Sequence, residues 1–139
     1  MRKLTMFTIM ILILALALVA CGGDDGGDSE EAAPVGDAAQ GETLYNGTTI
    51  GSASAPGCVT CHSLEEGVVV VGPSHAGVAS RAAGYVSGQS AEDYLRASII
   101  DPDAHIVDGF TAGVMYPNYG SDLSDQEIDD LVAYLLTLD

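Results

Sequence analysis

The order of apolar and polar residues divides the chain into three parts. Residues 4–20 form one predominantly apolar run, whereas residues 22–36 contain little except glycine, acidic residues and small side chains. From residue 37 to the end, apolar residues recur in short groups separated by glycine and proline. Such groups are typical of a small folded domain with irregular connections. The pattern therefore predicts one domain of roughly 100 residues, preceded by an apolar segment and by an acidic, glycine-rich segment.

Three stretches of this domain have the features of amphipathic helices. The first is expected over residues 37–45 with Asp37 as its N-cap, and the second over residues 90–100, where Ser90 begins a capping-box pattern. A terminal helix follows a second capping box at Ser124. Its apolar residues recur at helical spacing at Ile128, Leu131, Val132, Leu135, Leu136 and Leu138. These helices predict an all-α fold.

The segments between the helices are rich in glycine and proline. We expect loops over residues 46–57, 82–89 and 103–120, and one or two helical turns over residues 74–81. The four consecutive valines at 68–71 would suit a strand, but no partner strand is evident nearby. They are therefore interpreted as an extended apolar segment that packs against a bound cofactor.

The first 20 residues have the features of an export signal, since a basic start precedes the apolar run and a small residue ends it. Leu18, Ala20 and Cys21 resemble the lipobox of a bacterial lipoprotein signal, which implies cleavage before Cys21 and attachment of lipid to that cysteine. The alternative is an uncleaved anchor helix, although a run of about 17 residues is short for spanning a bilayer. Both interpretations place the domain at the outer face of the cytoplasmic membrane.

The part of the chain from Cys21 onward is strongly acidic. Residues 21–36 are predicted to be a flexible, acidic, glycine-rich tether. From Cys21 to the end there are 20 acidic side chains and two basic ones, Arg81 and Arg96, a formal charge of −18. Nucleic acid is excluded as a partner, because phosphate binding requires a basic surface. The charge favours protein partners with a positively charged docking surface, and solubility or adaptation to a salty habitat are alternative explanations.

The candidate chemistry is concentrated in the stretch Cys58-Val59-Thr60-Cys61-His62. Two cysteines two residues apart, with a histidine directly behind them, form the attachment signature of a c-type haem. Each thiol adds to one vinyl group of the haem to give a thioether, and the imidazole then lies beneath the iron as its proximal ligand. The motif predicts one haem c, covalently bound through Cys58 and Cys61 and ligated by His62.

Three other interpretations of the two cysteines are weaker. A zinc site would need a second Cys or His pair at ligand spacing, and the one remaining cysteine is Cys21, far upstream. A thioredoxin-like redox pair would lie near a βαβ pattern, which is absent from the sequence around it. A disulfide would close a very small loop and stabilise little. With lipid on Cys21 and haem on the other two, every sulfur has a role.

The second axial ligand is argued by elimination. Iron in c-type haems is usually ligated on its other face by methionine or histidine, and Met115 is the single methionine that remains after the signal. It lies in a loop, from which a thioether can reach the opposite haem face. His75 and His105 are the competitors, of which His75 is expected to pack or hydrogen-bond nearby and His105 to be exposed. A packing methionine is the remaining alternative.

At this point the pattern resembles a known family, class I cytochrome c, over residues 37–139. The resemblance rests on Cys58–His62, on Gly72-Pro73, on the Met115 loop and on a terminal helix that contains Tyr134. It is similar to the monohaem cytochrome c domains of haem–copper oxidase subunit II and to the lipoprotein monohaem subunits of alternative complex III. The family implies three to five short helices wrapped around one covalently bound haem. One departure is Tyr116, where the family more often has proline.

The resemblance also implies roles for individual residues. Pro73 matches the proline whose carbonyl accepts a hydrogen bond from the proximal histidine, which orients that ring. Gly41 and Tyr45 match first-helix positions that cross the last helix near Leu131, Tyr134 and Leu135. From their positions near haem-lining segments, Arg81 and Tyr119 are candidate partners of the haem propionates. A surface charge is the alternative for Arg81, and Arg96 is expected at the surface.

These residues predict a one-electron carrier rather than an enzyme. Axial ligation by both His62 and Met115 leaves no open site, so we expect no catalysis and no small-molecule substrate. A methionine ligand raises the haem potential, which suits a respiratory or photosynthetic electron-transport chain. The expected partners are a quinol-oxidising complex and a terminal oxidase or reaction centre. The alternative is a haem-based sensor or gas-binding domain with a labile sixth ligand, and a peroxidase-like enzyme is weaker still.

Overall fold

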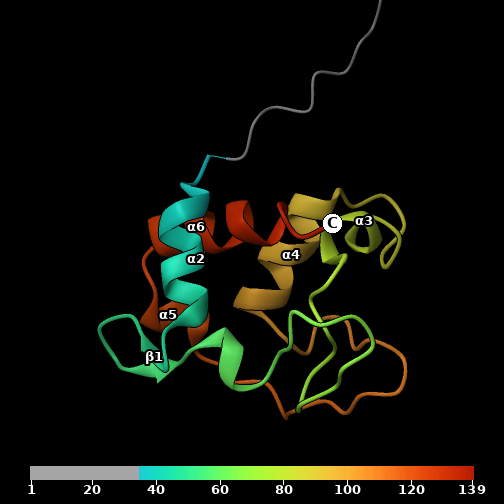
Figure 1. The fold of residues 1–139 in the computed structure, drawn as a ribbon, viewed down its shortest axis with the longest axis horizontal. Helices are drawn as coiled ribbons and strands as arrows, with labels where there is room; N and C mark the ends of the chain where they lie inside the picture. Colours follow the sequence, from blue (N-terminus) through green and yellow to red (C-terminus); the bar gives the residue numbers. More distant parts are fainter. Residues whose placement is uncertain (1–34) are drawn as a thin grey trace, which may run out of the picture. The chain divides into compact units, whose positions relative to one another are not determined.

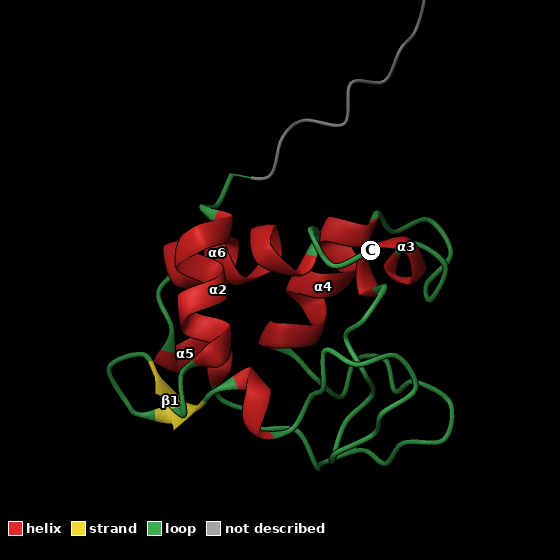
Figure 2. Cartoon of the chain, viewed as in Figure 1, coloured by secondary structure: helices red, strands yellow, loops and turns green. Residues whose placement is uncertain are grey.

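The computed structural model describes residues 35–139. The predicted signal at residues 1–20, the lipidated Cys21 and nearly all of the tether at 21–36 lie outside the described residues. The helices are α2 (Ala38–Asn46), α3 (Val78–Ala82), α4 (Ala91–Ile100), α5 (Tyr119–Asp122) and α6 (Asp125–Leu135), with a 3-10 turn η1 (Cys58–Thr60) and strands β1 (Thr49–Ile50) and β2 (Ala55–Pro56) (Figures 1 and 2). No helix within the described range is long and apolar enough to cross a membrane.

Helices α2 and α6 cross at close range and form the main scaffold. A Cβ atom built on Gly41 would lie 1.9 Å from the carbonyl oxygen of Asp130 and 2.8 Å from the Cβ of Tyr134, so α2 can approach α6 only because residue 41 is a glycine. Beside it Tyr45 is fully buried, and its ring centroid lies 5.3 Å from that of Tyr134. The predicted crossing of the first and last helices is confirmed.

The helix starts follow the capping residues in the sequence. The Asp37 carboxylate accepts hydrogen bonds from two backbone amides of the first turn of α2. Ser124 and Glu127 form the complete capping box at α6, in which each side chain accepts from the backbone amide of the other residue. At α4 the Ser90 hydroxyl accepts from the amide of Asp93 at 3.1 Å. Capping satisfies amides that a helix leaves without partners.

A buried carboxylate fastens the start of the domain to its last helix. Asp130 is 6% exposed and accepts a hydrogen bond from the amide of Asp37 at 2.7 Å and from the side chain of Gln126 at 2.8 Å. Gly36, the last residue of the predicted tether, packs so closely that a Cβ there would lie 2.1 Å from the carbonyl oxygen of Asp129. Within the described residues, Gly36 and Asp37 are therefore the point where the start of the domain is fastened to α6.

Two predicted loops contain short regular elements instead. Within residues 46–57, β1 and β2 pair antiparallel, with Ile50 opposite Ala55, and the chain turns through Gly51 at a φ of 68°. At the end of residues 103–120, the chain enters the single turn of α5. Two-residue strands and one-turn helices are too short to produce a periodic pattern, so no sequence signal predicts them.

The valines at 68–71 are between 41% and 60% exposed. Their packing against a bound cofactor stays a prediction, but their path is bent rather than extended. The backbone amides of Val71 and Gly72 both donate to the carbonyl of Cys61, at 3.1 and 3.0 Å, which curls the segment back around the cysteine motif. This curl replaces an extended path and turns the valines toward solvent, although Val69 and Val71 still reach the edge of the cavity.

Replacement of Gly41 by alanine tests the helix crossing. The new methyl group would meet the Asp130 carbonyl, so we expect Gly41→Ala to lower the free energy of unfolding by about 2 kcal/mol. Gln40→Ala, on the exposed side of the same helix, is expected to change it by less than about 0.5 kcal/mol. Denaturant unfolding of the haem-loaded protein measures both. A gain in stability for Gly41→Ala, as helix propensity alone predicts, would contradict the close crossing.

Candidate functional site

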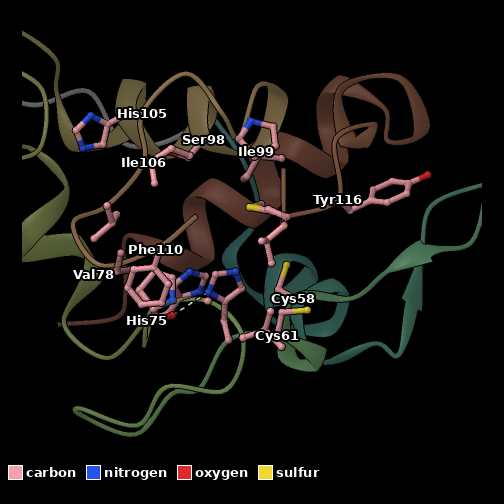
Figure 3. Close-up of a pocket in the computed structure, with 18 of the residues that line it drawn as sticks. Cys58, Cys61, His75, Val78, Ser98, Ile99, His105, Ile106, Phe110 and Tyr116 are labelled. Atoms are coloured by element: carbon pink, nitrogen blue, oxygen red, sulfur yellow. Dashed lines mark hydrogen bonds between the residues drawn. The ribbon is translucent and has the colours of Figure 1, made fainter. Parts of the chain in front are cut away.

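One cavity of about 690 Å³ is lined by all seven residues that the sequence assigned to cofactor binding. Its walls come from η1, from the segment 71–78, from α4 and from the segment 102–117 (Figure 3). The seven are Cys58, Cys61, His62, Pro73, Arg81, Met115 and Tyr119. The volume lies within the usual range of ligand pockets in proteins. Arg81 in α3 and Tyr119 in α5 add to these walls, so the fold brings together residues from widely separated parts of the chain.

The 3-10 turn η1 places both cysteines at one edge of the cavity. The amides of Cys61 and His62 both donate to the carbonyl of Cys58, at 3.1 and 2.9 Å, and the Thr60 hydroxyl closes the turn onto Gly57 at 2.7 Å. Both cysteines are free thiols that are partly buried, with their sulfur atoms close together (Figure 3). Burial raises the pKa of the Cys58 thiol to about 12. Before haem attachment the side chain is thus a neutral thiol at neutral pH, compatible with its apolar surroundings.

His62 is held in one orientation by a backbone carbonyl. Its Nδ1 lies 2.8 Å from the carbonyl oxygen of Pro73, and a carbonyl can only accept, so Nδ1 carries the proton and donates. Nε2 then keeps its lone pair. Burial lowers the pKa of His62, and the bond to Pro73 opposes this in part. A buried, neutral imidazole with an unprotonated Nε2 is the form that binds a metal.

Met115 and His105 belong to the wall formed by residues 102–117. Met115 is partly buried and packs against the edge of the hydrophobic core. His105 was predicted to be exposed, and this was wrong, because its ring packs between Tyr85 and Tyr94 with centroids 5.9 and 5.7 Å away. Aromatic packing thus partly shields a histidine that lies in an acidic loop. Figure 3 shows His105 far from Cys58 within the cavity.

Comparison with known proteins agrees with this geometry. The family model of cytochrome c matches residues 38–139, almost the whole described part of the chain. The chain belongs to the cytochrome c family. No curated protein matches the sequence at a significant level. The mostly helical fold is that of a small cytochrome c, haem c is attached covalently through Cys58 and Cys61, and the domain functions in haem-based electron transfer.

The residues of this cytochrome c fit the cofactor in their local chemistry. Cys58 and Cys61 are not joined in a disulfide and stand two residues apart in the sequence, and His62 uses one ring nitrogen, Nδ1, in its hydrogen bond to Pro73, with no hydrogen bond to Nε2 within residues 35–139. Below the imidazole, Gly72 allows the backbone to pass at close range, because a Cβ there would lie 2.4 Å from Cε1 of His62. The lack of space beside the His62 ring therefore explains why residue 72 is a glycine, which the sequence alone did not reveal.

His75 supports the proximal side of the cytochrome c site. Its ring stacks on that of His62 with centroids 4.0 Å apart, and its Nδ1 lies 3.2 Å from the hydroxyl oxygen of Tyr45. Burial, with a further effect of the nearby His62 and Arg81, lowers the pKa of His75 to about 3, so the ring is neutral at physiological pH. Because it lies beside His62, His75 is poorly placed to ligate the opposite face of a haem. The expected nearby packing and hydrogen bonding of His75 are both present.

Arg81 and Tyr119 line the cavity but have protein partners. The exposed Arg81 guanidinium donates to the carbonyls of Ala76 and Ser74, at 2.6 and 2.9 Å, and so braces the turn behind Pro73. Its contact with a propionate stays a prediction. The buried Tyr119 donates its hydroxyl hydrogen to the carbonyl of Pro56 at 2.6 Å. Its predicted contact with a propionate also stays a prediction, although its hydroxyl hydrogen is engaged by Pro56 here.

Replacement of Gly72 by alanine tests how the proximal imidazole is held. The added methyl would overlap the His62 ring, so we expect the ring to shift and its bond to the Pro73 carbonyl to weaken. The measurable result is a mixed-spin component in the haem spectrum that the parent protein lacks. Gly84→Ala is the control, since it lies away from His62, a Cβ there meets only the Arg81 carbonyl oxygen at 3.3 Å, and its φ is not positive. Equal spectra for both variants would show that Gly72 does not constrain His62.

Proposed function

We propose that this domain carries single electrons through a haem whose iron is ligated by His62 and Met115. The observation that carries the proposal is that both side chains line one cavity together with the two attachment cysteines. His62 is already oriented, with Nε2 free. When bound there, haem supplies a one-electron couple. Its potential is raised by a methionine ligand, which suits the high-potential end of a respiratory or photosynthetic chain.

Several features of the chain favour electron transfer over catalysis. His62 and Met115 together would occupy both axial positions, which leaves no coordination site for a substrate. Two histidine rings besides His62 line the cavity, and both are engaged in aromatic packing. His75 stacks on His62, and His105 packs against Tyr94. His75 is also kept neutral by burial, which lowers its pKa. A function as carrier, alone or as a subunit of a larger oxidoreductase complex, therefore fits best.

The proposed partners are redox proteins that present an apolar centre within a basic rim. Val69, Val71 and Val114 line the edge of the cavity and are between 48% and 60% exposed, so they form an apolar edge where a cofactor would be nearest to solvent. Glu65 and Glu66 are exposed on the same segment. With a chain charge of −16, attraction by a cationic surface would speed encounter. A quinol-oxidising complex and a terminal oxidase or reaction centre are the proposed classes of partner.

The proposed location is the outer face of the cytoplasmic membrane. Its support is the sequence of the first 36 residues, in which an export signal ends at a lipobox-like cysteine, Cys21, followed by a glycine-rich acidic stretch. A lipid on Cys21 would keep the domain near membrane-bound partners. Similarity to the cytochrome c domains of oxidase subunit II and to subunits of alternative complex III belongs to the same proposal.

Met115→Ala tests the axial ligand. We expect the weak near-infrared band that reports iron–methionine ligation to be present in the parent protein and absent from the variant. The affinity of the haem iron for added imidazole should rise by at least about tenfold in the variant. In the parent protein imidazole must displace the Met115 thioether, whereas the variant has no such bond to break. Val114→Ala, an exposed neighbour on the same loop, serves as control and should keep the parent spectrum. A parent protein that lacks the band and binds carbon monoxide readily would instead indicate a sensor or gas-binding domain.

Val69→Asp tests the docking surface. A carboxylate placed in the apolar edge must lose water when a partner docks, so we expect electron exchange with a lysine-rich cytochrome c, used as probe, to slow by about fivefold. Val35→Asp adds the same charge at a valine that is 80% exposed and outside the cavity lining, and should leave the rate unchanged or slightly higher. Stopped-flow rates at several salt concentrations measure both. Equal rates for the two variants would place docking elsewhere.

A further inference from the structure

Two tyrosine hydroxyls fasten the segment that carries Met115. Tyr116, the next residue, donates its hydroxyl hydrogen to the carboxylate of Asp122 in α5. Tyr119 donates to the carbonyl of Pro56 in β2, two residues before Cys58. The rings of Tyr116 and Tyr119 pack edge to face with centroids 5.1 Å apart. The two rings thus join the Met115 loop to the segment that leads into the cysteine motif.

The acceptor of the Tyr116 bond is itself held in place. The second carboxylate oxygen of Asp122 lies 3.3 Å from the hydroxyl of Ser121, and its backbone amide donates to the carbonyl of Asn118 at 3.0 Å. The hairpin packs tightly against its backbone, since a Cβ on Gly51 would lie 2.7 Å from the Asp122 carbonyl oxygen. Because the Asp122 carboxylate is held in place, its hydrogen bond to Tyr116 restricts the backbone position of Tyr116 as well as the rotamer of its side chain.

The other side of Met115 is held as well. The amide of Gly113 donates to the carboxylate of Asp103 at 2.8 Å, and Gly113 has a φ of 74° that a residue with a side chain rarely adopts. Val114, which is exposed, lies between this bond and that of Tyr116. Tyr116 itself lines the cavity, and Figure 3 shows its hydroxyl end directed away from the cavity residues His75 and Phe110. Bonds on both sides thus restrict Met115, which lies at the same cavity lining.

We propose that Tyr116 is a positioning residue: its hydrogen bond to Asp122 holds Met115 in ligating position and thereby sets how readily another ligand displaces it. The inference rests on the proposed ligation by Met115 and adds the residues that control it. Displacement exchanges one electron-pair donor on the iron, the Met115 thioether, for another, with no net transfer of electrons or protons. Without the Tyr116 bond the loop has more freedom, so the bound geometry of Met115 has a higher entropic cost.

Imidazole titration of the oxidised, haem-loaded protein tests this inference. We expect Tyr116→Phe to keep the near-infrared band but to bind imidazole about tenfold more tightly, because a hydrogen bond to a charged acceptor is lost. The band should also disappear at lower temperature than in the parent. Tyr134→Phe is the matched control: it removes a hydroxyl on α6 and should leave both measurements unchanged.

A second variant separates positioning from general stability. Asp122→Asn keeps an oxygen that can accept from Tyr116, so its imidazole affinity should lie between those of the parent and Tyr116→Phe, and the double variant should bind no more tightly than Tyr116→Phe alone. If Tyr116→Phe lowers only the unfolding midpoint and leaves imidazole affinity at the Tyr134→Phe value, the inference is overturned while ligation by Met115 stands. A parent protein without the near-infrared band overturns both.

Discussion

The close contact of α2 with α6 at Gly41 is the constraint on which the rest of the domain depends. It places Tyr45 against Tyr134 in the core, and the hydroxyl of Tyr45 then reaches His75. His75 in turn stacks on His62, the imidazole next to the attachment cysteines. The close helix crossing that Gly41 permits is therefore linked to the site through successive contacts of the Tyr45, His75 and His62 rings. The same contact explains how a cytochrome c with only short helices can hold a large cavity at one side.

Local signals in the sequence predicted much of this fold. The capping residues Asp37, Ser90 and Ser124 mark helix starts because a side-chain oxygen bonds to an amide within three residues, a purely local interaction. The hairpin and α5 had no such signal. The bend at the valines 68–71 had none either, because two backbone bonds to the Cys61 carbonyl decide the path of that segment. That acceptor lies outside any local pattern.

The site shows the same division. The spacing of Cys58, Cys61 and His62 is dictated by the chemistry of attachment, so it can be recognised in one sequence, and Met115 follows by elimination. The stacking of His75 and the bond from Tyr119 to Pro56 could not be foreseen, because each joins segments that meet only after folding. Tyr119 illustrates the difficulty: its proximity to the cavity was expected, but the direction of its hydroxyl depends on a carbonyl 63 residues earlier in the chain.

The buried Asp130 has a mechanical consequence. Its carboxylate accepts a hydrogen bond from the amide of Asp37, and Gly36 packs against α6, so the start of the domain is held at one place on that helix. That point lies at the start of α2, away from the loops that surround the cavity (Figure 1). A pull applied at this point would therefore load α6 as well as α2, because the bond between Asp37 and Asp130 joins the two helices.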